Sequence, residues 1–433
     1  MDVIISLALI FVLLLTSVIL GISVLYPLII GLIIFSILSL KKGFTYRQLF
    51  KMIFSGALKT EKIYSLLILV GLSIGLWNGC GTIPTLIYTC LKFVNPNYFL
   101  LFSFFSTFLV SLALGSAFGT TGTIGIVLIT LAKAANLDLN LVGATIISAV
   151  YIGERSTPLS SCANLISALT YTNLYENLKN MFSSGKYLFF ISLIAYGAIS
   201  LLSPANANFD YLIKNLETTY TLSHFCLIPI FIIFIMAFFK ADIKLTLSLS
   251  IISSLFIGIY VEHTSLSNLF SYSIFGYYLD SNHPLSSIIK GGGLLNFVKT
   301  ILIIMVSSAY AGIFEGTSIL KFFEKTVSTW VEKFGVYMTT FLVSFLGCAF
   351  GCSQTFGVIT SYQFMNPHYK KDDVSRSKFA LDLGNTALLM APLIPWNIGS
   401  IFPATVLGIS AMYIPYAFFL YLLPISLIFK HKK

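Results

Sequence analysis

Long stretches of the chain carry only apolar and uncharged polar residues, and they set the class of the fold. A membrane-spanning helix needs about 20 mainly apolar residues, so each stretch is long enough for one pass and several can hold two. A buried core helix of about 10–14 apolar residues does not explain runs of this length. The stretches without Asp, Glu, Lys or Arg are 3–40, 63–91, 93–132, 187–209, 218–239, 334–369 and 383–429.

The length of the chain predicts how often it crosses the bilayer. If each pass and its loop take roughly 30–35 residues, the 433 residues give about 10–13 hydrophobic passes, some of them incomplete. We therefore predict an all-α polytopic membrane protein. Helices are expected near 3–19, 23–40, 63–78, 83–93, 97–114, 121–135, 140–151, 162–172, 187–203, 222–239, 244–260, 296–313, 336–349, 354–365, 378–391 and 400–429.

Two longer polar stretches interrupt this pattern, at 204–221 and at 261–295. The second contains three consecutive glycines, which indicate a hinge. We interpret the first as the linker between two membrane halves, 1–203 and 222–433. No small-residue cleavage site follows the first apolar stretch, so we interpret 3–20 as a retained helix rather than a signal peptide.

Composition supports the membrane interpretation, and the charge distribution predicts an orientation. The chain is 57% hydrophobic and only 10% charged, whereas soluble domains are about 25% charged, which excludes an ordinary soluble enzyme. The net charge of +10 indicates orientation and not nucleic-acid binding. Basic residues crowd the connection 41–59 and the tail 430–433, and positively charged loops stay cytoplasmic. We expect a cell-membrane protein with both termini in the cytoplasm.

The sequence offers no ligand set for metal-dependent hydrolysis. The five histidines are scattered, with no HExxH, and the six cysteines contain no CxxC pair. We interpret the cysteines as small membrane-packing residues. The sequence therefore predicts a protein that is not an enzyme and has no cofactor. The cysteines are Cys80, Cys90, Cys162, Cys226, Cys348 and Cys352.

The two halves resemble each other in sequence. Residues 115–126 align without gaps on 347–358 at an offset of 232, with three glycines identical in both. Further on, Pro158-Leu159 meets Pro392-Leu393 at an offset of 234. Two matches in register favour an internal duplication. Repeats with Gly- or Pro-interrupted apolar segments are typical of secondary transporters, whose sites lie at the bilayer midplane between the repeats.

The segment Gly119-Thr120-Thr121-Gly122-Thr123 is a candidate ion site. Glycine and threonine are poor helix formers, so we expect the helix to break here and to expose carbonyl and hydroxyl oxygens. Such oxygens can replace the hydration shell of Na⁺. A contact surface of small residues, on which helices approach closely, remains an alternative interpretation.

The segment 153–164 is a second candidate, because Pro158 removes a backbone donor amid a cluster of hydroxyl groups. Glu154 either reaches the cavity or forms an ordinary pair with Arg155 at the membrane surface. Acidic side chains inside a membrane are expensive and usually functional, so the depth of Glu154 decides between the two. Glu315 is a weaker candidate, because a cap at a helix end explains it equally well.

In the second half, Asp382, Asn385 and Thr386 fall on one face of a helix, which the prolines that follow should break. Exchange requires a group whose protonation competes with Na⁺, and burial of a carboxyl group favours its protonated form. Asp382 or Glu154 would be this proton carrier. Alternatively, Asp382 pairs with Arg376 or Lys378 at the cytoplasmic edge.

Five segments together resemble the NhaC-type sodium/proton antiporters. They are Gly75–Thr85, Gly119–Thr123, Tyr151–Asn164, Ala391–Asn397 and Tyr413–Phe418, and they cover most of the chain in the expected order. The resemblance implies a transporter of the ion-transporter superfamily with inverted repeats and re-entrant hairpins. It also implies a homodimer with an elevator-like architecture.

The chain departs from that family at acidic positions. Ser161 stands where members usually have an aspartate, and Gly384 and Asn385 replace the acidic residues usual before the second proline motif. Some relatives carry small organic anions or amino acids, and a loss of acids fits such a change. We therefore keep a Na⁺-coupled or exchange transporter of a small organic solute as the alternative to a Na⁺/H⁺ antiporter.

These arguments define a predicted site between the repeats, with Na⁺ and H⁺ as the expected partners and a small organic solute as the alternative one. The predicted ion or substrate ligands are Gly119, Thr120, Thr121, Thr123, Ser160, Ser161, Asn164, Ser353, Gln354, Thr355, Asn385, Thr386 and Asn397. Within this set, Thr121, Thr123 and Asn164 are the predicted Na⁺ ligands.

Overall fold

The computed structural model describes residues 3–93, 96–202, 209–239, 241–286, 288–317, 323–370 and 372–430. It confirms the predicted all-α class. Within the described residues, the only sheet is a two-stranded antiparallel pair, β1 (Tyr277–Tyr278) and β2 (Lys290–Gly291).

The first half consists of twelve α-helices, a π-helical segment and a short 3-10 helix. They are α1 (Val3–Ile19), α2 (Leu25–Lys41), α3 (Tyr46–Leu58), α4 (Glu61–Gly79), α5 (Thr82–Phe93), η1 (Pro96–Tyr98), α6 (Phe99–Leu114), α7 (Ala117–Thr120), the π-helical η2 (Thr121–Gly125), α8 (Ile126–Ala134), α9 (Leu139–Arg155), α10 (Ser161–Thr170), α11 (Leu174–Leu202) and α12 (Phe209–Thr219).

The second half continues with helices and the small sheet. Its helices are η3 (His224–Leu227), α13 (Ile228–Phe238), α14 (Ile243–Tyr260), α15 (Leu266–Phe275), α16 (Leu294–Thr317), α17 (Phe323–Phe334), α18 (Val336–Gly351), α19 (Gln354–Met365), η5 (Asn366–His368), α20 (Asp373–Asn385), α21 (Ala387–Met390), η6 (Ala391–Leu393), α22 (Ile398–Leu407), η7 (Ala411–Tyr416) and α23 (Phe418–Lys430).

Many of these helices suit a membrane by length and composition. Among the described residues, five helices are long and apolar enough to cross a bilayer, or up to seven if each of two bent pairs forms one span. One bent pair joins α20 and α21 to α22 at an angle of 49°. Several more apolar helices of 10–17 residues are too short to cross alone. The chain is therefore a multi-pass membrane protein with interrupted spans.

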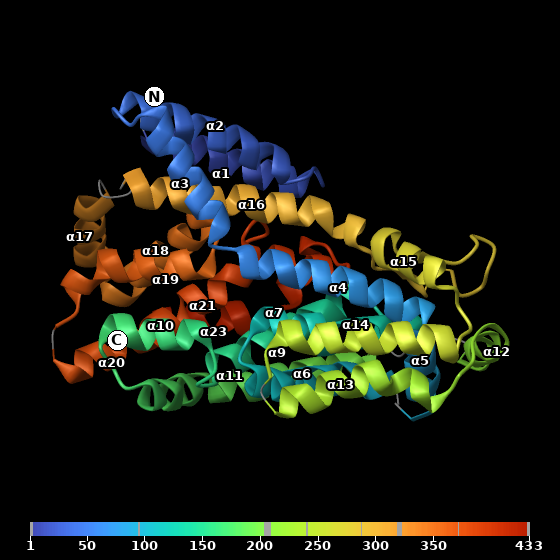
Figure 1. The fold of residues 1–433 in the computed structure, drawn as a ribbon. Helices are drawn as coiled ribbons and strands as arrows, with labels where there is room; N and C mark the ends of the chain where they lie inside the picture. Colours follow the sequence, from blue (N-terminus) through green and yellow to red (C-terminus); the bar gives the residue numbers. More distant parts are fainter. Residues whose placement is uncertain are drawn as a thin grey trace.

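The helix axes run mostly in one direction, from left to right in Figure 1. We call the left side, where α17 and α20 lie, the α17 end, and the right side the α15 end. α1 begins and α23 ends toward the α17 end. α6 enters the bundle from the α15 end and α18 enters it from the α17 end, so these two helices run in opposite directions (Figure 1).

α9 forms the centre of the bundle. Every residue from Leu141 to Arg155 is buried, and the segment is built mainly from small and β-branched residues. The continuous span from Ala117 to Ala134 is almost as deeply buried. Helices that are apolar on all sides pack in the interior, so the two best-enclosed segments of the first half lie beside each other and frame the region between the halves.

Some of the predicted boundaries are wrong. The linker predicted at 204–221 contains α12, the polar stretch 261–295 contains α15 and the β pair, and the basic connection 41–59 contains α3. α17 was also missed. These helices are short or polar, so an apolar-span criterion does not detect them. The single helix expected at 400–429 is divided into α22, η7 and α23, because Gly408 adopts a left-handed conformation with φ of 66°.

α3 packs against α16 at backbone distance. A Cβ atom at Gly56 would lie 2.9 Å from the Cα atom of Gly312, and a Cβ atom at Gly312 would overlap the carbonyl oxygen of Met52. Small residues at such crossings let membrane helices approach closely. The contact seats the end of α3 firmly on α16.

We expect Gly312→Ala to destabilise the protein by about 1–3 kcal/mol, the usual cost of overpacking, because the new methyl group meets backbone that cannot move aside. Gly197→Ala is the matched control, since a Cβ atom there would meet only the side chain of Leu101 at 3.4 Å. Thermal unfolding of the purified protein in detergent measures both. An equal Tm for the two variants would contradict the packing argument.

Candidate functional site

A cavity of about 250 Å³ lies where the two halves of the chain meet. Polar and small side chains from both halves line it, together with the end of α3 and one face of α16. Its lining comprises Gly56, Lys59, Thr60, Ile63, Ser116, Phe118, Glu154, Ser161, Cys162, Ser308, Ala311, Glu315, Ser353, Gln354, Thr355, Phe356, Ile359, Ile398 and Gly399.

Four helices begin at this cavity. The span of α7 and α8 begins after Ser116, α10 after Ser160, α19 after Ser353 and α22 after Asn397. At least one residue in the first turn of each helix lines the cavity. The amino ends of four helices from both halves therefore surround one space.

The interruptions recur at a constant spacing in the two halves. The left-handed residues that end α6 and α18 are Gly115 and Cys352, 237 residues apart. The residues that precede α10 and α22, Ser160 and Asn397, are also 237 residues apart. This spacing differs by five from the offset of the glycine-rich sequence alignment, because α18 continues through Gly351 whereas α6 has already ended at the aligned position.

Within each half, the second interruption supplies partners for the first. Thr157 donates a hydrogen bond to the carbonyl oxygen of Leu112 at 2.9 Å. In the second half, the indole N–H of Trp396 donates to the carbonyl oxygen of Ala349 at 2.7 Å. Leu112 and Ala349 are again 237 residues apart. Polar groups released from a helix inside a bilayer need such protein partners.

The predicted helix break at Gly119–Thr123 is wrong. The helix continues from Ala117 to Ala134 and passes through a π-helical segment at Thr121–Gly125. The break lies earlier, at Gly115, where φ is 66° and a Cβ atom would clash with Leu159. The breaks predicted around Pro158 and before Asn397 are confirmed, since α10 and α22 begin just beyond them.

Helix amino ends make the cavity favourable for negative charge. Each end carries about half a positive elementary charge from its unpaired N–H groups. Ser116, Ser160 and Asn397 each accept a hydrogen bond from a backbone N–H of the helix they precede, but Ser353 makes no such bond at the start of α19. The N–H groups at the start of α19 therefore lack a side-chain cap.

Glu154 places a carboxyl group in this setting. It is 6% exposed and lines the cavity, so the interpretation as a surface loop pair is wrong. Its carboxyl group interacts with the backbone N–H of Ala117 and with the side chain of Gln354. These residues begin helices from the two halves. Its Oε2 atom has no hydrogen-bond partner among the described residues, so one oxygen remains free for a proton or a ligand.

Arg155 follows Glu154 in sequence but does not line the cavity. The guanidinium is buried and donates to the side-chain oxygens of Asn385 and Ser184. Asn385 is thus a neutral partner of a buried cation and lies away from the cavity.

Asp382 also lies away from the cavity. Its side chain is 2% exposed and accepts a hydrogen bond from the hydroxyl of Tyr369 at 2.8 Å. That hydroxyl lies 3.1 Å from the hydroxyl of Thr340. The expected alternative, an ion pair with Arg376 or Lys378, is absent from the described part of the chain.

The structure brings some predicted site residues together at the cavity and leaves others outside it. Those that line it are Glu154, Ser161, Ser353, Gln354 and Thr355. Thr386 is buried against Ser344, at 2.9 Å between the hydroxyls. The predicted residues that do not line the cavity are Gly119, Thr120, Thr121, Thr123, Ser160, Asn164, Asp382, Asn385, Thr386 and Asn397.

The three predicted Na⁺ ligands have other partners. The hydroxyl of Thr121 donates to the carbonyl oxygen of Ala117, and that of Thr123 donates to Gly119, each at 2.8 Å. The amide of Asn164 donates to the carbonyl oxygen of Ser160, at 2.7 Å. None of the three lines the cavity, and their role as Na⁺ ligands stays a prediction.

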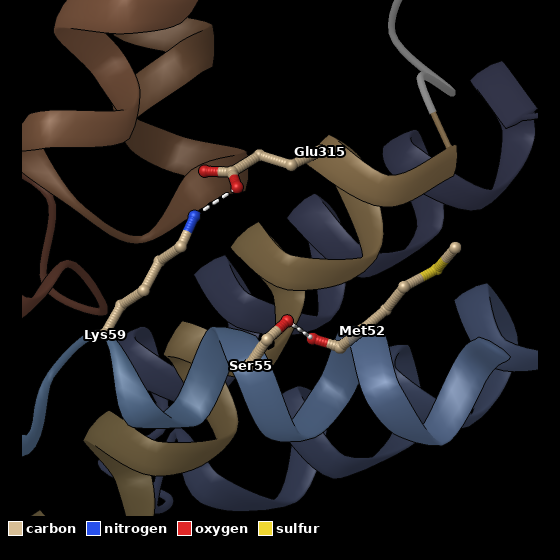
Figure 2. A network of polar contacts seen from close by, with 4 residues as sticks. All are labelled: Met52, Ser55, Lys59 and Glu315. Atoms are coloured by element: carbon tan, nitrogen blue, oxygen red, sulfur yellow. Dashed lines mark hydrogen bonds and ion pairs between the residues drawn. The ribbon is translucent and has the colours of Figure 1, made fainter. Parts of the chain in front are cut away.

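An ion pair at the rim of the cavity was missed by the sequence analysis. The ammonium group of Lys59, at the end of α3, contacts the carboxylate of Glu315, in the last turn of α16 (Figure 2). Both side chains line the cavity. Lys59 follows an apolar stretch directly and was counted only among the orienting basic residues. The contact joins positions 256 residues apart, so sequence spacing gives no signal for it.

A family model described as the Na⁺/H⁺ antiporter family matches residues 149–429, which is more than half of the chain. The chain belongs to this family. The match covers α9, α10 and the whole second half, and thus all of the site except the first interruption and α3. It confirms the resemblance drawn from the sequence motifs.

Curated relatives match nearly the whole chain. The Na⁺/H⁺ antiporter NhaC of Bacillus subtilis (strain 168) is 25% identical over 406 residues, 92% of this chain and 90% of that protein. The malate-2H⁺/Na⁺-lactate antiporter of the same organism is 25% identical over 88% of this chain and 83% of its own length. The arginine/ornithine antiporter ArcD of Halobacterium salinarum is 26% identical, with shares of 89% and 81%. The matches support a Na⁺/H⁺ antiporter or a related antiporter, and these relatives are transporters, not enzymes.

Cys162 provides a direct test of the cavity, because it lines the space at the start of α10 whereas Cys348 is buried elsewhere. A small methanethiosulfonate reagent should add to Cys162 and leave Cys348 unmodified. Mass spectrometry of peptides from the detergent-purified protein measures both. Addition at Cys348 with none at Cys162, or equal addition at both, would contradict the assigned cavity.

Proposed function

We propose that this chain is a Na⁺-linked secondary antiporter that exchanges Na⁺ for H⁺ through the cavity, with Glu154 as the proton carrier. The observation that carries the proposal is the buried carboxyl group of Glu154, which lines the cavity and has one oxygen without a partner. Intramembrane acids of this kind are costly and usually functional. Protonation of Glu154 would compete with a cation for the same oxygen.

Alternation of access follows from the position of the cavity. It lies between elements of the two halves, and in transporters with repeats one unit rocks or slides against the other around a fixed midplane site. Movement of the first half relative to α16 and α19 would expose Glu154 to one side of the membrane and then to the other. Na⁺ would be the transported or coupling ion, without any further cofactor.

The orientation and assembly belong to the same proposal. The basic turn between α2 and α3 lies toward the α17 end, and α23 ends toward it as well (Figure 1). By the positive-inside rule, we place the α17 end and both termini in the cytoplasm. The homodimer implied by the family resemblance stays a prediction.

The choice of Glu154 over Asp382 is tested in proteoliposomes. We expect Glu154→Gln to reduce Na⁺-dependent proton movement by at least about tenfold, the scale of losing one favourable charged contact, because no titrating group remains in the cavity. Asp382→Asn should retain substantial exchange, since Asp382 lies outside it. Asp373→Asn, an exposed position at the start of α20, is the control for loss of an acid. Wild-type exchange in Glu154→Gln would reject the assignment.

A second function is favoured by a specific feature, the four helix amino ends around the cavity. They favour negative charge, and in other transporters such ends face the carboxylate of the substrate. The names of two relatives point to lactate, malate, arginine and ornithine. The second candidate is therefore exchange of a small organic acid or amino acid.

We expect the two functions to separate in a counterflow experiment. Proteoliposomes loaded with an unlabelled solute should accumulate the labelled form only if the solute crosses by exchange. Labelled Na⁺, lactate, malate, arginine and ornithine serve as probes. Accumulation of Na⁺ alone supports Na⁺/H⁺ exchange, whereas accumulation of an organic probe supports the second function. Accumulation of no probe would contradict both.

A further inference from the structure

The ion pair between Lys59 and Glu315 lies at the rim of the cavity and not deep in the protein. The two side chains are 52% and 39% exposed, and Figure 2 shows them reaching toward each other from α3 and α16. In the part of the chain that the structure describes, it is the one ion pair between side chains. Both partners line the same space as Glu154.

The ion pair is not what holds α3 on α16. The two helices already meet at backbone distance through Gly56 and Gly312. Nearby, the hydroxyl of Thr60 lies 2.9 Å from that of Ser308 and adds a second polar contact across the same seam. Half-exposed ion pairs contribute little to stability and are weakened by salt. Lys59 and Glu315 can therefore separate without loss of the helix contact.

The pair also lies at one end of a polar face. Ser308, Ala311 and Glu315 line the cavity at spacings of three and four residues, which places them on one side of α16. Glu315 is nearest to the α17 end of this face, because it lies in the last turn of the helix (Figure 1). A cation that enters from the α17 end would meet Glu315 before it reaches Glu154.

Lys59 sits at a point where the chain can adjust. It follows the last residue of α3, and α4 begins only at Glu61, so Lys59 lies in the interruption between two helices. Its ammonium group ends a flexible four-carbon side chain and is a compact point charge. It can occupy the carboxylate of Glu315 in one state and swing away from it in another.

We propose that Lys59 is an internal cation that competes with the transported cation for Glu315 and thereby sets the cation affinity of the cavity. With Lys59 in place, Glu315 is neutralised and the rim offers no free negative charge. An entering Na⁺ takes the carboxylate and displaces the ammonium group. This inference rests on the proposed function, because it assigns a cation as the transported species.

The test compares Lys59→Gln with the wild type in proteoliposomes. Loss of the competitor should lower the KM for Na⁺ by about two- to fivefold, the scale of a half-exposed ion pair. Glu315→Gln should raise the KM, and Lys59→Gln should have no further effect in the Glu315→Gln background. Lys59→Arg keeps the charge and should leave the KM near the wild-type value.

Lys62→Gln is the matched control, because Lys62 is exposed in the first turn of α4 and does not line the cavity. It should leave the KM unchanged. The inference is overturned if Lys59→Gln leaves the KM unchanged or raises it, if its effect persists in the Glu315→Gln background, or if Lys62→Gln has the same effect.

A binding measurement separates this inference from the proposed function. The midpoint of Na⁺-induced thermal stabilisation in detergent should fall in Lys59→Gln, whereas the Tm without Na⁺ should stay near the wild-type value. If the wild type performs Na⁺/H⁺ exchange and this midpoint does not change, only the role of Lys59 fails. If the wild type performs no Na⁺/H⁺ exchange, the proposed function fails first.

Discussion

The organisation of this protein depends on one constraint: a backbone group released from a helix inside the bilayer must find a partner within the protein. α6 and α18 both end inside the bundle, and each leaves carbonyl oxygens without intrahelical donors. Thr157 satisfies one of them in the first half, and Trp396 satisfies the equivalent one in the second. Each donor comes from the second interruption of its own half, so the two interruptions of a half must lie together.

This pairing determines where charge can reside. When two interruptions meet, the helices that follow them begin at the same place, and the two halves together bring four amino ends to one cavity. Their partial positive charges make it possible to bury Glu154 there. Arg155, one position further along α9, points instead to the neutral oxygens of Asn385 and Ser184. The adjacent acid and base are therefore held in separate surroundings and do not neutralise each other.

The sequence predicts much of the fold and only part of the site. Apolar length identifies the membrane class, and the proline of each second interruption identifies where α10 and α22 begin. The first interruption was misplaced because glycine and threonine lower helix propensity without setting the break, which depends on the close approach of Leu159 to Gly115. The alignment offset differs from the structural one for the same reason, since the glycine-rich run lies inside the helix in the second half.

Long-range contacts account for the rest. The sequence places Glu154 beside a proline break but cannot give its depth, which is decided by helices from both halves. Lys59 and Glu315 belong to segments far apart in the chain, and only the packing of α3 on α16 brings them to one rim. Asp382 has the sequence context of a site residue, yet its surroundings are the hydroxyl groups of Tyr369 and Thr340.

The central claim is that a cation and a proton compete for Glu154 in the cavity. Proton release on addition of Na⁺ to the detergent-purified protein, followed with a pH indicator in weak buffer, measures that competition without a membrane or a transport cycle. The account predicts release from the wild type and none from Glu154→Gln, with choline chloride as the control for ionic strength. Equal release from the wild type and Glu154→Gln would contradict it.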